Sequence, residues 1–341
     1  MKKTLKAAVA LSVLTAPAYA ANLENPLYMP KQNEMYSKTS VGAMYKVADD
    51  TTAMVNKEHD GATEFPIWRL HEELGYGITD RLEAYAKVGY THDDDIARKG
   101  MHQGRVGLKY RAFETTDGFA WDIYADAHLG GVSGMTGSYG LNGFTYDNYS
   151  NGRWGFHAGT QVGKTWSKFT GAAFFEVLQT FGNDNNEIDI SKSALAAYVN
   201  MGDLPDEISV DLKSTTEFNA GLKTFYQIDD RWSVGAGFTF KHHEDNGVEG
   251  LATSINEAQL VPYPGLGDVP LGMIVKNLES QLKDMNDGFD EYIISLSGSY
   301  QLTDATQITL YGEYTFDDAH QGSQNGTDVK AELGARVNVV F

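Results

Sequence analysis

The sequence is dominated by segments in which apolar and polar residues alternate. In the final segment, AELGARVNVVF at 331–341, Leu333, Val337, Val339 and Phe341 belong to the apolar set, with Glu332 among the residues between them. Because successive side chains of a β-strand point to opposite faces, a period of two predicts a strand with one apolar and one polar face. The alternation occurs in twelve segments, which begin near residues 35, 68, 82, 106, 119, 154, 169, 208, 232, 292, 308 and 331.

The breaks between these segments alternate between short and long. Short breaks rich in Asp, Gly and Thr, which suit tight turns, lie at 78–81, 115–118, 163–167, 228–231 and 302–305. The long, polar breaks lie at roughly 48–65, 92–101, 131–152, 183–215, 243–288 and 317–327. This rhythm predicts an up-and-down antiparallel meander of twelve strands.

A count of fourteen strands is the alternative, because residues 191–212 could supply one more hairpin. However, the apolar register continues without a slip from Ile208 to Phe218. A tight turn near residue 214 would break that register. We therefore expect one long strand here, with residues 191–202 as a loop or short helix.

The first twenty residues have the three parts of a secretory signal. A basic start with Lys2, Lys3 and Lys6 precedes an apolar core at 7–14 and a small-x-small site at 18–20. The core is much shorter than the ~20 residues of a spanning helix, and no later apolar run approaches that length. We expect a cleaved signal peptide at 1–20, a periplasmic N-terminal segment at 21–34 and a barrel at 35–341.

Composition excludes two classes of protein. The chain has no cysteine, so no disulfide framework holds it together. It has 46 acidic and 27 basic residues, an excess of negative charge that argues against binding nucleic acid.

The strand faces favour a transmembrane barrel over a soluble one. A soluble barrel of twelve strands would have to fill a lumen of order 10 Å with mostly small apolar side chains, whose volumes fall short. Aromatic residues such as Tyr45, Trp68, Tyr90 and Trp232 stand near segment ends, as in the interfacial girdles of membrane barrels. The expected fold is thus all-β: a transmembrane up-and-down antiparallel β-barrel with its apolar face toward lipid.

The signal peptide, the alternation of short turns with long loops, and the terminal VNVVF together resemble Gram-negative outer-membrane β-barrel proteins over the whole mature chain. No motif identifies a narrower family. The resemblance implies location in the outer membrane, contact with its lipid, short turns in the periplasm and long loops outside. It also implies the barrel-assembly machinery as a partner that reads the last strand through Phe341, Val339 and Val337. The oligomeric state is not indicated.

The polar faces carry charges that we expect to line a pore. Basic residues prevail on the first four strands and acidic ones on the rest, and such a field across a lumen suits small hydrophilic solutes. The alternative is that the charges pair and seal a structural or adhesive barrel that presents acidic loops. The predicted lining residues are Lys38, Arg69, Lys87, Arg105, Lys109, Arg111, Asp122, Asp126, Glu176, Glu291, Glu313 and Arg336.

Two polar clusters, HDDD at 92–95 and KHHED at 241–245, are the strongest candidates for chemistry. Neither contains a nucleophile with its base, and adjacent histidines such as His242 and His243 point to opposite faces of a strand. Metal-ligand spacing is also lacking. We expect no enzyme activity and no cofactor, with at most weak binding of Ca²⁺ or Mg²⁺ by loop carboxylates.

The long break at 243–288 contains a helical pattern. Leu271, Ile274, Leu278 and Leu282 fall on one stripe after Asp268, a candidate N-cap, which predicts a helix over 269–287. The stripe must be buried in the barrel mouth, across the loops or against a partner. We expect the helix to restrict the mouth.

Overall fold

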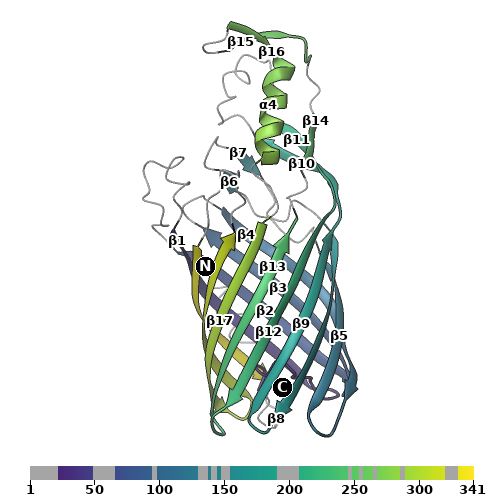
Figure 1. Ribbon diagram of the computed structural model, residues 1–341, viewed down its shortest axis with the longest axis vertical. Helices are drawn as coiled ribbons and strands as arrows, with labels where there is room; N and C mark the ends of the chain where they lie inside the picture. Colours follow the sequence, from purple (N-terminus) through teal and green to yellow (C-terminus); the bar gives the residue numbers. More distant parts are fainter. Residues whose placement is uncertain are drawn as a thin grey trace.

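Twelve antiparallel strands form a closed barrel in the computed structural model (Figure 1). They are β1 (Met35–Ala48), β2 (Ile67–Thr79), β3 (Leu82–Asp93), β4 (Arg98–Glu114), β5 (Phe119–His128), β8 (Gly155–Trp166), β9 (Phe169–Thr180), β12 (Thr215–Gln227), β13 (Trp232–His243), β17 (Phe289–Thr303), β18 (Thr306–Asp318) and β19 (Val329–Val340). The predicted architecture and its twelve strands are therefore confirmed.

The structure describes residues 22–48, 66–93, 98–129, 137–139, 144–146, 154–189, 207–244, 248–252, 256–263, 267–284, 289–318 and 329–341. The predicted signal peptide lies outside this part of the chain. Within it, no helix is both long enough and apolar enough to cross a membrane.

Pairing of the first and last barrel strands closes the sheet. β1 runs antiparallel to β19 from Tyr36 opposite Val340 to Ala48 opposite Val329. Beyond that ladder, Phe341 N donates to Met35 O at 2.7 Å. Closure leaves no strand edge with unpaired backbone groups, which is what a hydrocarbon environment demands.

The two faces of the barrel are inverted relative to a soluble protein. Outward-facing Leu296, Leu310 and Leu333 are 64%, 65% and 68% exposed, whereas inward-facing Thr309 and Asn338 are completely buried. The predicted orientation, with the apolar face outside, is confirmed.

Glu72 is a carboxylate on the outward face, between the outward residues Leu70 and Leu74 of β2. Ser37 Oγ donates to Glu72 Oε1 at 2.6 Å, and Thr39 donates to the other carboxylate oxygen. Two hydroxyls of the neighbouring strand thus provide hydrogen bonds that lipid cannot supply.

A layer of loop elements lies beyond the long-loop end of the barrel (Figure 1). It contains the sheet β14-β11-β10-β7-β6 and the hairpin of β15 and β16. The elements are β6 (Gly137–Tyr139), β7 (Phe144–Tyr146), β10 (Asn183–Asp189), β11 (Glu207–Leu212), β14 (Val248–Ala252), β15 (Leu260–Tyr263), β16 (Gly267–Pro270) and α4 (Leu271–Asp284).

The long strand predicted from Ile208 onward is interrupted, so that prediction is wrong in detail. β11 ends at Leu212 and joins the loop sheet, while β12 begins at Thr215 in the barrel. The neighbouring strand breaks at the same level, and Gly182 N donates to Ser214 Oγ at 3.1 Å across the two breaks. The two strands therefore leave the barrel together, which an apolar register alone does not reveal.

The predicted loop helix forms, but its buried stripe lies against loop elements. Leu271, Ile274 and Val275 are buried, and so are Val261 and Val269 of the β15–β16 hairpin. The described packing partners of α4 are β14 and β16, which both belong to the loop layer.

The start of α4 also differs from the prediction. Asp268 lies in β16 instead of capping the helix. The first amides of the helix are bound elsewhere: Leu271 N donates to Gln259 O at 2.8 Å and Gly272 N donates to Glu257 O at 3.0 Å.

The outward face generates a first prediction. Leu310→Arg should destabilise the folded barrel in lipid vesicles by about 2–4 kcal/mol, the cost of a cation near the bilayer midplane. Urea titrations followed by the heat-modifiable gel shift would measure this, with Leu310→Met as the matched control. Equal stability of both variants would show that Leu310 does not face hydrocarbon.

Candidate functional site

Residues 22–34, here called the N-terminal segment, lie against the inner wall of the barrel at its short-turn end. Asn22 Nδ2 donates to Gln227 Oε1 at 3.0 Å and to Ser233 Oγ at 3.2 Å, and Asn22 Oδ1 accepts from Gln307 Nε2 at 3.0 Å. These partners belong to β12, β13 and β18. The sequence predicts this segment only as periplasmic chain and not as part of the lumen.

The segment then reaches the opposite wall. Three successive backbone carbonyls, of residues 26–28, accept hydrogen bonds from Gln161 Nε2, Arg111 Nη2 and Lys109 Nζ at 2.5, 2.6 and 2.9 Å. Leu27 also packs with Ala120 and Ala172. The segment therefore crosses the lumen from β12, β13 and β18 to β4 and β8.

A carboxylate of the segment binds the last strand. Arg336 Nη1 donates to both carboxylate oxygens of Glu24 at 3.0 and 3.1 Å, and Asn338 Nδ2 donates to Oε1 at 2.8 Å. Burial by itself would raise the pKa of Glu24. Arg336, Asn338 and the nearby Lys38 outweigh burial and hold the pKa of this carboxyl below its usual range.

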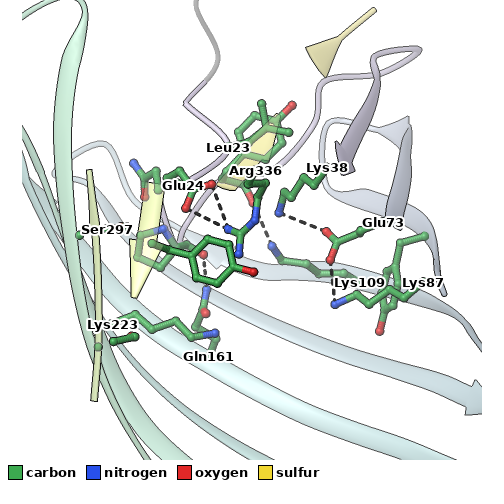
Figure 2. Close-up of a pocket in the computed structure, with 18 of the residues that line it drawn as sticks. Leu23, Glu24, Lys38, Glu73, Lys87, Lys109, Gln161, Lys223, Ser297 and Arg336 are labelled. Atoms are coloured by element: carbon green, nitrogen blue, oxygen red, sulfur yellow. Dashed lines mark hydrogen bonds and ion pairs between the residues drawn. The ribbon is translucent and has the colours of Figure 1, made fainter. Parts of the chain in front are cut away.

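Ion pairs within the lumen neutralise many of the basic residues predicted on the first four barrel strands. Glu73 lies 3.1 Å from Lys38 Nζ and 3.0 Å from Lys87 Nζ (Figure 2). Arg69 lies 3.2 Å from Glu332. Each pair joins residues on different strands that face the same interior.

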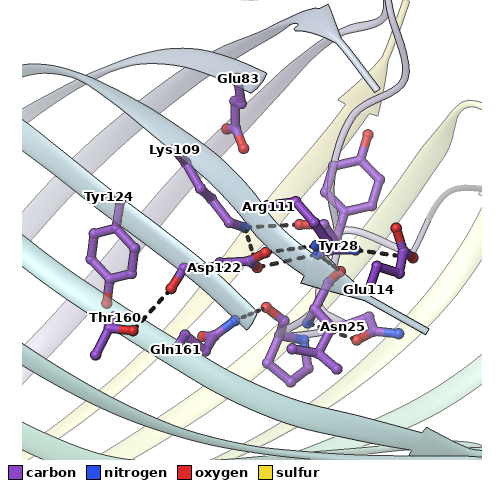
Figure 3. Close-up of polar contacts among 12 residues, drawn as sticks. Asn25, Tyr28, Glu83, Lys109, Arg111, Glu114, Asp122, Tyr124, Thr160 and Gln161 are labelled. Carbon is purple, nitrogen blue, oxygen red and sulfur yellow. Dashed lines mark hydrogen bonds and ion pairs between the residues drawn. The ribbon is translucent and has the colours of Figure 1, made fainter. Parts of the chain in front are cut away.

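A second charged group is packed into the wall beside the N-terminal segment. Arg111 Nε donates to Asp122 Oδ1 at 2.6 Å, and Lys109 Nζ lies 3.6 Å from the same carboxylate (Figure 3). Arg111 is only 5% exposed and Asp122 is completely buried. The carbonyl of Leu27 adds another acceptor for Arg111, so the N-terminal segment completes this group.

His157 joins two of the predicted lining carboxylates, Asp126 and Glu176, although the sequence predicts no role for the histidine itself. His157 Nδ1 lies 2.8 Å from Asp126 Oδ2, and Nε2 lies 3.6 Å from Glu176 Oε2. Tyr85 and Tyr124 donate to these two carboxylates at 2.7 and 2.6 Å. The inward register of β8 could have identified His157, because it stands between the inward positions of Gly155 and Gly159.

The described residues enclose two polar cavities inside the barrel, of about 480 and 290 Å³. Both are lined by Lys38, Glu73, Lys87 and Arg336, so they adjoin one another. Of the predicted lining residues, the larger cavity contacts Lys38, Lys87, Arg105, Lys109, Glu176, Glu313 and Arg336.

The other predicted lining residues also face the interior. Arg69 lines the smaller cavity. Arg111, Asp122 and Asp126 are buried in the wall. Glu291 lies 3.7 Å from Lys241 and lines neither cavity.

The two polar clusters singled out in the sequence fall at the long-loop end. Asp94, Asp95 and Asp245 lie outside the described residues, and His242 pairs with Asp290 at 2.7 Å. Among the described residues, no three His, Asp or Glu side chains are grouped as metal ligands.

The Arg111–Asp122 pair generates a second prediction. Arg111→Met alone should destabilise the barrel by about 3–5 kcal/mol, because it leaves Asp122 buried without its main partner. The double variant Arg111→Met/Asp122→Leu should recover most of that loss. Urea unfolding in vesicles would measure both, and additive losses in the double variant would contradict the coupling.

No protein-family model matches this chain, and no curated protein matches its sequence. Among solved structures, an outer membrane channel from Pseudomonas putida F1 is similar over 96% of this chain and 100% of its own, with 13% identity and a TM-score of 0.53. The CymD monoaromatic hydrocarbon channel is similar over 96% of this chain and 95% of its own, with 11% identity and a TM-score of 0.46. With the closed twelve-stranded barrel, the first similarity confirms the resemblance to Gram-negative outer-membrane β-barrels at the level of the fold.

Proposed function

We propose that the protein is an outer-membrane channel for small hydrophilic solutes, narrowed at its periplasmic end by the N-terminal segment. The observation that carries this proposal is the contrast between an apolar outer face and an interior with charged cavities of about 480 and 290 Å³. Such an interior holds water and polar solutes in place of a packed apolar core.

The polar lining also argues against hydrocarbons as the solute in the lumen. One similar structure is called a hydrocarbon channel, but here Lys87, Arg105 and Glu176 face the larger cavity. An apolar molecule would have to desolvate these charges without offering them a partner, which is costly.

The membrane location follows from the same contrast. The short turns would lie in the periplasm and the loop layer outside, once export has removed the predicted signal peptide. We assign α4 to the loop layer instead of the mouth, because Leu271, Ile274 and Val275 are already buried and the helix packs against β14 and β16.

A sealed structural barrel is the second candidate. The observation in its favour is that the N-terminal segment occupies the short-turn end and hydrogen-bonds to opposite walls. The two candidates differ in whether ions pass through the folded protein.

Planar bilayer recordings provide the third prediction. Glu24→Gln should raise conductance or open probability about tenfold, since it weakens charge-assisted hydrogen bonds worth about 1.5–3 kcal/mol each and 1.4 kcal/mol is a factor of ten. Asp230→Asn, a change to an exposed carboxylate in the turn at 228–231, is the matched control and should behave as wild type. Folded protein that passes no current in any form would establish the sealed barrel instead.

The same recordings have a defined pH dependence. Docking lowers the pKa of Glu24, so the ionised carboxylate stabilises the docked segment fully at pH values above the ordinary carboxyl pKa of ~4.3. This stabilisation is lost as the pH falls through the lowered pKa. Acidification below about pH 4 should therefore open wild type, and Glu24→Gln should lack this response. A response of equal size in both would assign the effect to other carboxylates.

We also propose that Phe341 serves as an assembly signal, together with Val339 and Val337. The fourth prediction is that deleting Phe341 reduces insertion into the outer membrane severalfold without affecting export. Cell fractionation with the heat-modifiable gel shift would measure this, and Leu302→Ala, at an exposed apolar position of the short-turn end, is the control. Wild-type levels of folded, truncated barrel would remove this role.

A further inference from the structure

One side of the larger cavity bears polar groups that no described residue satisfies. Lys223 of β12, Ser295 and Ser297 of β17 and Glu313 of β18 all line it. In the described part of the chain, none of these side chains has a hydrogen-bond or ion-pair partner. Lys223 Nζ lies 4.5 Å from the centre of the Phe174 ring and is attracted electrostatically by Glu176 of the same cavity. Figure 2 shows Lys223 and Ser297 across the cavity from the paired Glu73, Lys38 and Lys87.

These groups lie at one level of the wall. Lys223 is opposite Gly237, Gly237 is opposite Ser295, and Ser295 is opposite Glu313. A Cβ at Gly237 would lie 2.6 Å from Ser295 Oγ, and one at Gly235 would lie 2.6 Å from Ser297 Oγ. The serine hydroxyls therefore lie over the two glycines. We call this part of the cavity wall the recess: it is lined by glycine and serine, with a cation at one end and an anion at the other.

The spacing of the charges restricts the ligand. Three strand spacings separate the backbones of Lys223 and Glu313, about 14 Å along the wall, and the inward-pointing side chains shorten that span. The ammonium and carboxylate groups of an α-amino acid are attached to the same carbon atom and cannot reach both ends. A solute with separated charges and polar groups between them would satisfy all four side chains.

We infer that this recess binds short zwitterionic peptides as they pass through the lumen. The peptide carboxylate would pair with Lys223 and its ammonium with Glu313, and its amide groups would hydrogen-bond to Ser295 and Ser297. A simple anion would meet Glu313, and a simple cation would meet Lys223. The inference rests on the proposed channel function, but binding can be measured without current.

Isothermal titration of the refolded full-length barrel in detergent tests the site, with triglycine as the probe. Triglycine should bind at least about tenfold more tightly than N-acetyltriglycine, which lacks the ammonium, and triglycine amide, which lacks the carboxylate. Glycine should bind at least about tenfold more weakly than triglycine. Equal affinities for triglycine and its blocked forms, or tighter binding of glycine, would overturn the inference.

Variants assign the two ends of the peptide. Lys223→Gln should weaken triglycine about tenfold and leave the amide unchanged, and Glu313→Gln should weaken triglycine and leave the N-acetyl form unchanged. Lys241→Gln, which removes an inward lysine outside the cavity, is the control and should bind as wild type. Unchanged affinity in both site variants would refute the assignment.

Bilayer recordings separate this inference from the proposed function. Triglycine binding by a barrel that passes no current would support the recess while refuting the channel. Current without selective triglycine binding would support the channel while refuting the recess.

Discussion

The pairing of β1 with β19 is the constraint on which the rest of the structure depends. It closes the sheet, so that every barrel strand has two neighbours and no strand edge depends on water for its backbone hydrogen bonds. The same seam places Lys38 of β1 opposite Asn338 of β19, next to Arg336. Because Glu24 binds Arg336 and Asn338 there, closure of the barrel also builds the docking site of the N-terminal segment.

Closure with apolar residues outside forces charges into the interior, where they must satisfy one another. An isolated buried charge costs several kcal/mol. Arg111 therefore has two partners: Asp122 in the wall and a backbone carbonyl of the N-terminal segment. The segment thus stabilises the cations of the lumen while occupying its short-turn end. At Lys223 and Glu313, to which the described residues make no hydrogen bond or ion pair, the interior has groups available to a solute.

The sequence predicts the barrel well because its signal is local. A period of two specifies strands and faces, and the spacing of the breaks specifies connectivity, so the twelve strands and most inward charges follow. The position of the N-terminal segment could not be predicted, because it has no periodicity and its contacts are remote in sequence, as between Asn22 and Gln307. Likewise, the break before β12 and the surroundings of α4 depend on pairing within the loop layer.

The central claim, that the N-terminal segment is docked inside the lumen, can be tested with a single cysteine because the chain has none. Leu27 is 7% exposed, whereas Gln32 of the same segment is exposed. In the refolded barrel at neutral pH, a bulky maleimide should label Leu27→Cys at least about a hundredfold more slowly than Gln32→Cys, and adding Glu24→Gln should speed the labelling of position 27. Rapid labelling of both positions in the otherwise wild-type barrel would contradict the docked segment and the account built on it.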